Sequence, residues 1–128
     1  MNEESSTPES IVRAWWTFID QRDFKGATRL CSIRTGVDWP LSNERMAAMA
    51  DWQSVNEHYP GQWNASIAEL IAHEESVVTV ARVFNDEASF TAISFFTIRD
   101  GLIEKVVEYW PETYDAPEGR SRWTQPIS

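Results

Sequence analysis

The residue with the clearest chemical potential in this 128-residue sequence is Glu108, which stands in the run VVEYW at 106–110. Burial among large apolar side chains disfavours the charged form of a carboxylate and raises its pKa, as a general acid or base near neutral pH requires. The alternative is a structural ion pair, in which Arg82 or an arginine near the C-terminus neutralises Glu108. Both readings stay open at this point.

Asp38 is the second candidate acid or base, because it stands beside Trp39 at an expected bend; its alternative role is to cap that turn. Seven tryptophans are many for a chain of this length, and indoles suit the wall of an apolar cavity. Tyr109 could donate a hydrogen bond to a developing oxyanion, or it could simply pack. The side chains expected to bind a ligand are Trp16, Trp39, Phe96, Trp110, Tyr109 and His58.

No residue pattern indicates a metal or a cofactor. His58 and His73 are the only histidines, and neither has a second ligand at helical or strand spacing. The sequence contains no glycine-rich phosphate loop. The single cysteine, Cys31, cannot form an internal disulfide and is expected to be an inert thiol of a reducing compartment.

A net charge of −9 argues against nucleic acid and anionic membranes as partners, since both would be repelled. No apolar run approaches the roughly 20 residues of a membrane span, and the N-terminus does not resemble a signal peptide. We therefore expect a cytoplasmic protein that forms a single domain over residues 1–128.

The element that must position Glu108 is a hairpin of two long strands, residues 88–99 and 102–110, joined by Asp100-Gly101. This dipeptide favours a tight turn with positive φ at both residues. Strict alternation would place Leu102, Val106 and Glu108 on one side of the second strand. The sequence does not decide which side of this strand faces the core.

Two helices are expected before the strands. Residues 1–6 should be frayed, Thr7 should cap a helix that runs to about Gln21, and Asp23 should cap a shorter one. The segment 34–41 then predicts a short strand, and Ser42 is expected to cap a third helix over residues 43–57.

From Trp63 the apolar period changes to two, which predicts strands over 63–72 and 77–84 ahead of the hairpin. Residues 111–128 are expected to form an extended tail with Trp123 as an anchor. The expected fold class is α+β, with three N-terminal helices packed in a strongly curved antiparallel sheet.

This order of elements resembles the NTF2-like superfamily, and within it the SnoaL-like group. The resemblance rests on VDWP at 37–40, FFTIRDGLIEKVVEYW at 95–110 and YDAPEGRSRW at 114–123. It implies a cone with an apolar pocket, dimers formed through the outer sheet face, and an acid on the last strand that shuttles a proton. The matching acid is Glu108, a Glu where the cyclases of the group use Asp, and Val106 stands where some members carry His.

The sequence therefore supports a protein that binds a small apolar, ring-like ligand, with acid/base catalysis of the isomerase, cyclase or hydrolase type by Glu108. The alternative is a non-catalytic dimeric module that binds a protein partner. A third possibility is a domain whose own tryptophans and tail fill the pocket.

Overall fold

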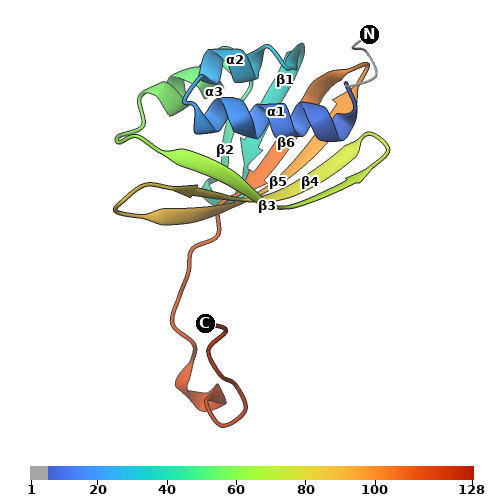
Figure 1. Cartoon of the computed structure of the whole chain (residues 1–128). Coiled ribbons are helices and arrows are strands. Elements are labelled where there is room, and N and C mark those ends of the chain that lie inside the picture. The colour runs from blue at the N-terminus through green and yellow to red at the C-terminus, as the bar shows by residue number, and fades with distance from the viewer. Residues whose placement is uncertain (1–5) are drawn as a thin grey trace.

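The computed structural model describes residues 6–128, so nearly all of the segment expected to fray lies outside the described residues. Three helices lie on one side of a strongly bent six-stranded sheet (Figure 1). In chain order the helices and strands are α1 (Pro8–Asp20), α2 (Phe24–Thr28), β1 (Cys31–Trp39), β2 (Glu44–Met46), α3 (Met49–Glu57), β3 (Asn64–His73), β4 (Ser76–Phe84), β5 (Ser89–Arg99) and β6 (Leu102–Tyr109).

The sheet has the order β2-β1-β6-β5-β4-β3. The meander from β3 to β6 is antiparallel, as predicted. β1, however, pairs in parallel with β6, with Val37 opposite Val106. The expectation of a purely antiparallel sheet is therefore wrong: the sheet is mixed, because β1 comes from before the meander and covers the free edge of its last strand.

The first two helices begin where their capping residues predict. The Thr7 hydroxyl accepts a hydrogen bond from the Ser10 backbone N–H at 3.1 Å, and Pro8 occupies the first turn of α1. The Asp23 carboxylate accepts from the Gly26 N–H at 2.9 Å at the start of α2. Both predictions are confirmed.

The third helix does not begin at Ser42. Asn43 adopts a left-handed conformation, φ 57°, and turns the chain back so that β2 pairs with β1. This pairing buries Met46 opposite Val37 on a strand, where the sequence suggested the inner side of a helix. Two strands, instead of one, thus separate α2 from α3, and α3 spans only nine residues.

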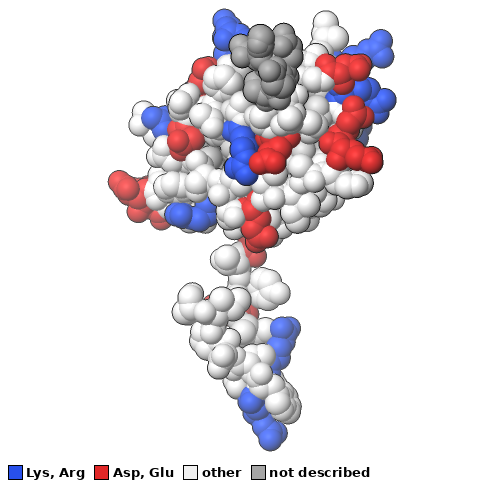
Figure 2. All heavy atoms as spheres, turned by 45° about the vertical axis from the view of Figure 1, so that its right-hand side comes forward, with Lys and Arg blue, Asp and Glu red and all other residues white. Residues whose placement is uncertain are grey.

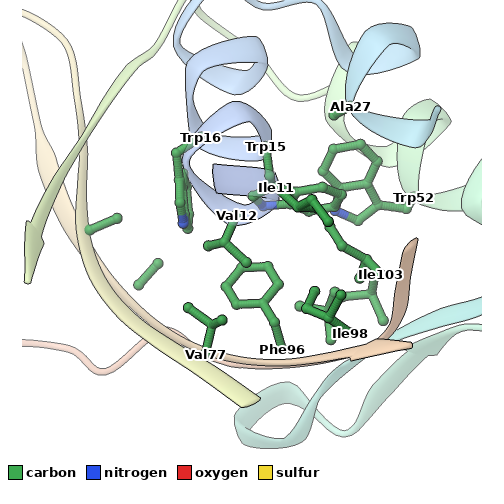
Figure 3. Close-up of a cluster of buried hydrophobic side chains, with 14 of the residues drawn as sticks. Ile11, Val12, Trp15, Trp16, Ala27, Trp52, Val77, Phe96, Ile98 and Ile103 are labelled. Carbon is green, nitrogen blue, oxygen red and sulfur yellow. The ribbon is translucent and has the colours of Figure 1, made fainter. Parts of the chain in front are cut away.

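The core lies between α1 and the inner face of the sheet, and its buried side chains include Trp15, Trp16 and Trp52 (Figure 3). The rings of Trp15 and Trp52 lie 4.6 Å apart, so they tie α1 to α3. Phe96 rises from β5 and meets Trp15 edge-on at 6.0 Å. Aromatic pairs of this geometry add about 0.5–1.5 kcal/mol each to the burial of their area.

The face of the sheet that points away from the helices, here called the outer sheet face, carries apolar side chains in a cross-strand row. Paired residues place Ile71, Val78, Phe95 and Val107 side by side across four strands. Phe95 is 45% exposed and Ile71 is 67% exposed. No helix of the described chain lies over this row (Figure 1).

Residues 111–128, called the tail, continue beyond β6 and run away from the helices (Figures 1 and 2). Every residue of the tail is exposed, and its only regular element is a short turn at Glu118–Arg120. Within the described residues, no helix has the length and the apolar character needed to cross a membrane.

Candidate functional site

A β-bulge decides which way Glu108 points. Thr97 pairs with Lys105 while the next residue of β5, Ile98, pairs with Ile103, so Glu104 is an extra residue in β6. With the turn at 100–101 and no bulge, Glu108 would pair with Ile93, whose side chain lies on the outer sheet face. The bulge moves the pairing by one residue and sets Glu108 opposite Ser94 on the inner face.

The Glu108 carboxylate receives two hydrogen bonds from neighbouring strands. The Ser94 hydroxyl donates to Oε2 at 2.6 Å, and the Trp39 indole N–H donates to Oε1 at 3.1 Å. The residue is only 4% exposed. No cation of the described chain lies within ion-pair distance, since Arg82 donates to Ser89 and lies over the ring of Phe84. The structural ion pair with Arg82 is therefore wrong.

Burial raises the pKa of Glu108 above its ordinary value, because the charged form loses its hydration. The hydrogen bonds from Ser94 and Trp39 oppose this rise, since they favour the carboxylate. The Trp110 indole acts in the same direction. Its Nε1 is buried and makes no hydrogen bond with any described residue.

A row of small polar side chains crosses the inner face next to Glu108. Thr79 of β4 pairs with Ser94 of β5, and Ser94 pairs with Glu108 of β6. Thr79 and Ser94 are fully buried. Trp16 extends from α1 toward the sheet and donates its N–H to the Thr79 hydroxyl at 3.0 Å (Figure 3). The sheet thus carries a hydrogen-bonding stripe through an otherwise apolar interior.

Glu108 opens onto a cavity of about 580 Å³ between the helices and one end of the sheet. A volume of this size suits a small organic molecule. Aromatic side chains dominate the wall: Trp15, Trp16, Phe24, Trp39, Trp52, Tyr59, Trp63, Phe90 and Trp110. Glu57, Glu112 and Arg22 add charged groups to the lining.

A second cavity of about 570 Å³ reaches Glu108 from the side of the turn that follows β1. It shares Trp39, Glu108, Trp110 and Glu112 with the first cavity and adds Leu41 and Ser42. The rings of Trp39 and Trp110 meet edge-on, 6.3 Å apart. The carboxyl therefore lies where two hollows meet, between two indoles.

Four of the residues expected at the site lie elsewhere. Asp38 alternates with Trp39 along β1 and points to the other face, where it accepts hydrogen bonds from Arg45 at 2.7 Å and Lys105 at 3.0 Å. Both cations hold its pKa well below the ordinary value. Tyr109 packs on Phe95 across the outer sheet face.

Phe96 belongs to the core beside the cavity, and its contact there is with Trp15. His58 ends α3, where its Nδ1 lies 2.8 Å from the Ser54 carbonyl oxygen. Of the expected residues, the cavity brings together Glu108, Trp16, Trp39 and Trp110.

Ser94 and Thr79 are polar residues beside Glu108 that the sequence did not reveal. Counting from the tight turn pairs Ser94 with Val107, so its contact with Glu108 appears only once the bulge is known. A small polar residue between Ala92 and Phe96 on a buried strand face was the available signal. Within residues 6–128, no group of three His, Cys, Asp or Glu side chains could hold a metal ion.

The three helices, the curved sheet and the cavity between them define the NTF2-like fold, and the solved structures that match this chain share it. The predicted resemblance is confirmed at the level of the fold. Searches of the sequence against models of protein families and against curated proteins find no match.

Three solved structures illustrate the likeness. A Kribbella flavida chain provisionally assigned as a ketosteroid isomerase superposes with a TM-score of 0.87 at 23% identity, over 99% of this chain and 93% of that one. An NTF2-like protein of unknown function from Burkholderia xenovorans gives 0.81 at 20% identity, over 100% of both chains. A provisionally assigned SnoaL-like polyketide cyclase from Shewanella putrefaciens gives 0.68 at 8%, over 80% and 79%.

Proposed function

We propose that this protein binds a small, apolar, ring-bearing molecule in the cavity beside Glu108 and transfers a proton to or from it. The observation that carries the proposal is a buried carboxyl that no cation within residues 6–128 pairs with, at the meeting point of two aromatic-walled hollows. A buried carboxylate lowers the stability of the fold unless its partners compensate fully for the lost hydration. A protein that keeps such a group without full compensation is expected to use it. Its two donors satisfy one lone pair on each oxygen and leave acceptor capacity free.

The roles follow from the contacts. Trp39 and Ser94 would hold the carboxyl in place, since each fixes one oxygen. The indoles of Trp16, Trp39 and Trp110 would sandwich the ring system and exclude water. The raised pKa of Glu108 would favour proton uptake by this carboxyl during the reaction. Isomerisation, cyclisation and hydrolysis are reaction types that use such a step. Two of the proteins of similar fold are provisionally assigned, one as a ketosteroid isomerase and one as a polyketide cyclase.

Native mass spectrometry of the protein, purified gently from its host, tests the binding step. We expect a mass increment from a retained small molecule. A cavity-filling change, Val83→Trp, should abolish it, because Val83 lines the wall. If the protein carries no increment and also binds nothing from a panel of polycyclic ketones and phenols, the proposal fails.

The proton-transfer role is tested with Glu108→Gln, assayed on the molecule so identified. The amide that this change introduces can still accept from Trp39 and can donate to the Ser94 oxygen, so folding and binding should persist. Turnover should fall by about 10²–10⁴-fold, the range of a lost general acid or base. Glu104→Gln is the matched control, since Glu104 lies on the same strand and pairs with Arg99 at 3.0 Å. Full activity of Glu108→Gln would end the acid/base role.

A second candidate function is a dimeric interaction module, and the outer sheet face favours it. The row from Ile71 to Val107 presents partly exposed apolar side chains without a covering element. Exposed apolar patches of this kind mark interfaces. Binding of a ligand and dimerisation can coexist, because the cavity and the outer sheet face lie on opposite sides of the sheet.

A further inference from the structure

The tail carries large apolar side chains that the rest of the described chain leaves exposed. Its exposed apolar side chains are Tyr114 at 81%, Trp123 at 74% and Ile127 at 105%. The hydrogen bonds of this segment join one of its residues to another, as when the Trp123 N–H donates to the Arg120 carbonyl at 2.9 Å. Within residues 6–128, nothing of the body covers these three side chains.

Holding the tail in one conformation costs conformational entropy, and buried contacts with the described body do not offset this cost. Ordering the backbone costs about 1–2 kcal/mol per residue, and the tail has no burial of its own to offset this. The likeness to the Kribbella flavida and Burkholderia xenovorans chains nevertheless spans 99% and 100% of this chain, tail included. Exposed apolar side chains of this kind gain burial only when a surface covers them, and within residues 6–128 the body of the same chain does not cover them.

We infer that the tail is an exchanged arm, which packs on a second copy of this chain. A second copy is the occupant that the chemistry favours, because the chain itself offers the apolar surface that such an arm needs, on its outer sheet face. Exchange about a twofold axis would also give both tails the same environment and leave neither exposed.

Charge supports a copy of this chain as the partner. Residues 120–128 contain Arg120 and Arg122 but no acidic side chain, whereas residues 1–110 contain 17 acidic and nine basic ones. The far end of the tail shows this positive charge, and the visible face of the body carries acidic and basic groups together (Figure 2). Residues 111–119 carry Glu112, Asp115 and Glu118, so it is the basic end of the arm, residues 120–128, that is attracted to the acidic body of another copy. This inference does not rest on the proposed ligand or on proton transfer.

Photo-cross-linking of isotopically mixed protein tests the inference. Trp123 in the full chain is replaced by the photoreactive residue p-benzoylphenylalanine, and ¹⁵N-labelled and unlabelled protein are mixed, equilibrated and irradiated. Mass spectrometry should show cross-links that join heavy to light peptides. The same photoreactive residue at Val55, which is exposed on α3 but lies outside the tail, should not give them. Cross-links confined to one isotope would show that the tail folds back on its own body, and would overturn the inference. An absence of cross-links at residue 123 would overturn it too.

Sedimentation gives an independent reading. In the double variant Tyr114→Ser/Trp123→Ser, we expect the dissociation constant of the dimer to rise at least tenfold, because the arm loses its two aromatic anchors. Val55→Ser is the control, with the same change from apolar to polar at an exposed site. An unchanged dissociation constant in the double variant, or a monomeric wild-type protein at all concentrations, would refute arm exchange.

Discussion

The raised pKa of Glu108 comes from its burial and from the lack of a paired cation among the described residues. Two donors from different strands hold its oxygens, yet no cation of the described chain neutralises it. Asp38, only one strand away, shows the opposite arrangement, with two cations and a lowered pKa. The sequence offers Glu108 as the first candidate and Asp38 as the second, and of these two carboxyls only Glu108 has surroundings that raise its pKa.

This contrast predicts a pH dependence of stability. Folding raises the pKa of Glu108, so between the ordinary value of 4.5 and the raised value the folded state holds a proton that the unfolded state has lost. The contribution of Glu108 to stability is therefore best below pH 4.5 and is lost as the pH rises. Glu108→Gln does not titrate and should gain stability relative to wild type on going from pH 4 to pH 8.

Urea unfolding of both proteins at several pH values measures this difference. Asp38 works in the opposite sense, because its lowered pKa gives stability that is lost on acidification. Since both proteins contain Asp38, its effect cancels in the comparison. Parallel stability curves for wild type and Glu108→Gln would contradict the raised pKa.

At the scale of elements, the hairpin of β5 and β6 was predictable in its length and its turn, but its register was not. Asp100 and Gly101 take φ values of 54° and 78°, which the dipeptide implies. The bulge at Glu104 left no comparable signature. Strict alternation in LIEKVVEYW would put at least one charged side chain on each face of the strand. The structure buries both Ile103 and Val106, which are three positions apart and can share a face only because the bulge lies between them.

The prediction of one helix over residues 43–57 is wrong for a related reason. The run from Asn43 to Glu57 has apolar residues at helical spacing, and local propensity alone favours one long helix there. Pairing with β1 satisfies the backbone of Glu44–Met46 and buries Met46, which outweighs that preference. Long-range strand pairing is not visible in a local pattern.

The turn between β5 and β6 can be tested directly. Gly101→Ala should destabilise the protein by about 1–2 kcal/mol, because its φ of 78° lies in the left-handed region that a β-carbon disfavours. No atom lies within 4 Å of the added carbon, so the penalty comes from the backbone alone. Gly119→Ala, at an equally open site without positive φ, should leave the midpoint of thermal unfolding unchanged. Equal midpoints for both variants would contradict a strained turn.

At the scale of the whole molecule, the proposed dimer would bring the outer sheet face and the tail against a second copy of the chain. Phe95→Glu places a charge in the middle of the apolar row and should shift the protein toward monomer without unfolding it. Val55→Glu adds the same charge at an exposed site on α3 and should not. Sedimentation velocity at micromolar concentration distinguishes the two, and a dimer that survives Phe95→Glu would exclude this face as the interface.

The parallel pairing of β1 with β6 has a consequence for how the chain matures. Trp39 and Glu108 are 69 positions apart, and contacts at such separation form late because closing the loop costs entropy before it gains anything. The ribosome also releases β6 after every other strand. A nascent chain would thus leave β1 unpaired along this edge and Glu108 unburied until β6 docks, so the sheet and the surroundings of Glu108 are completed in the same step.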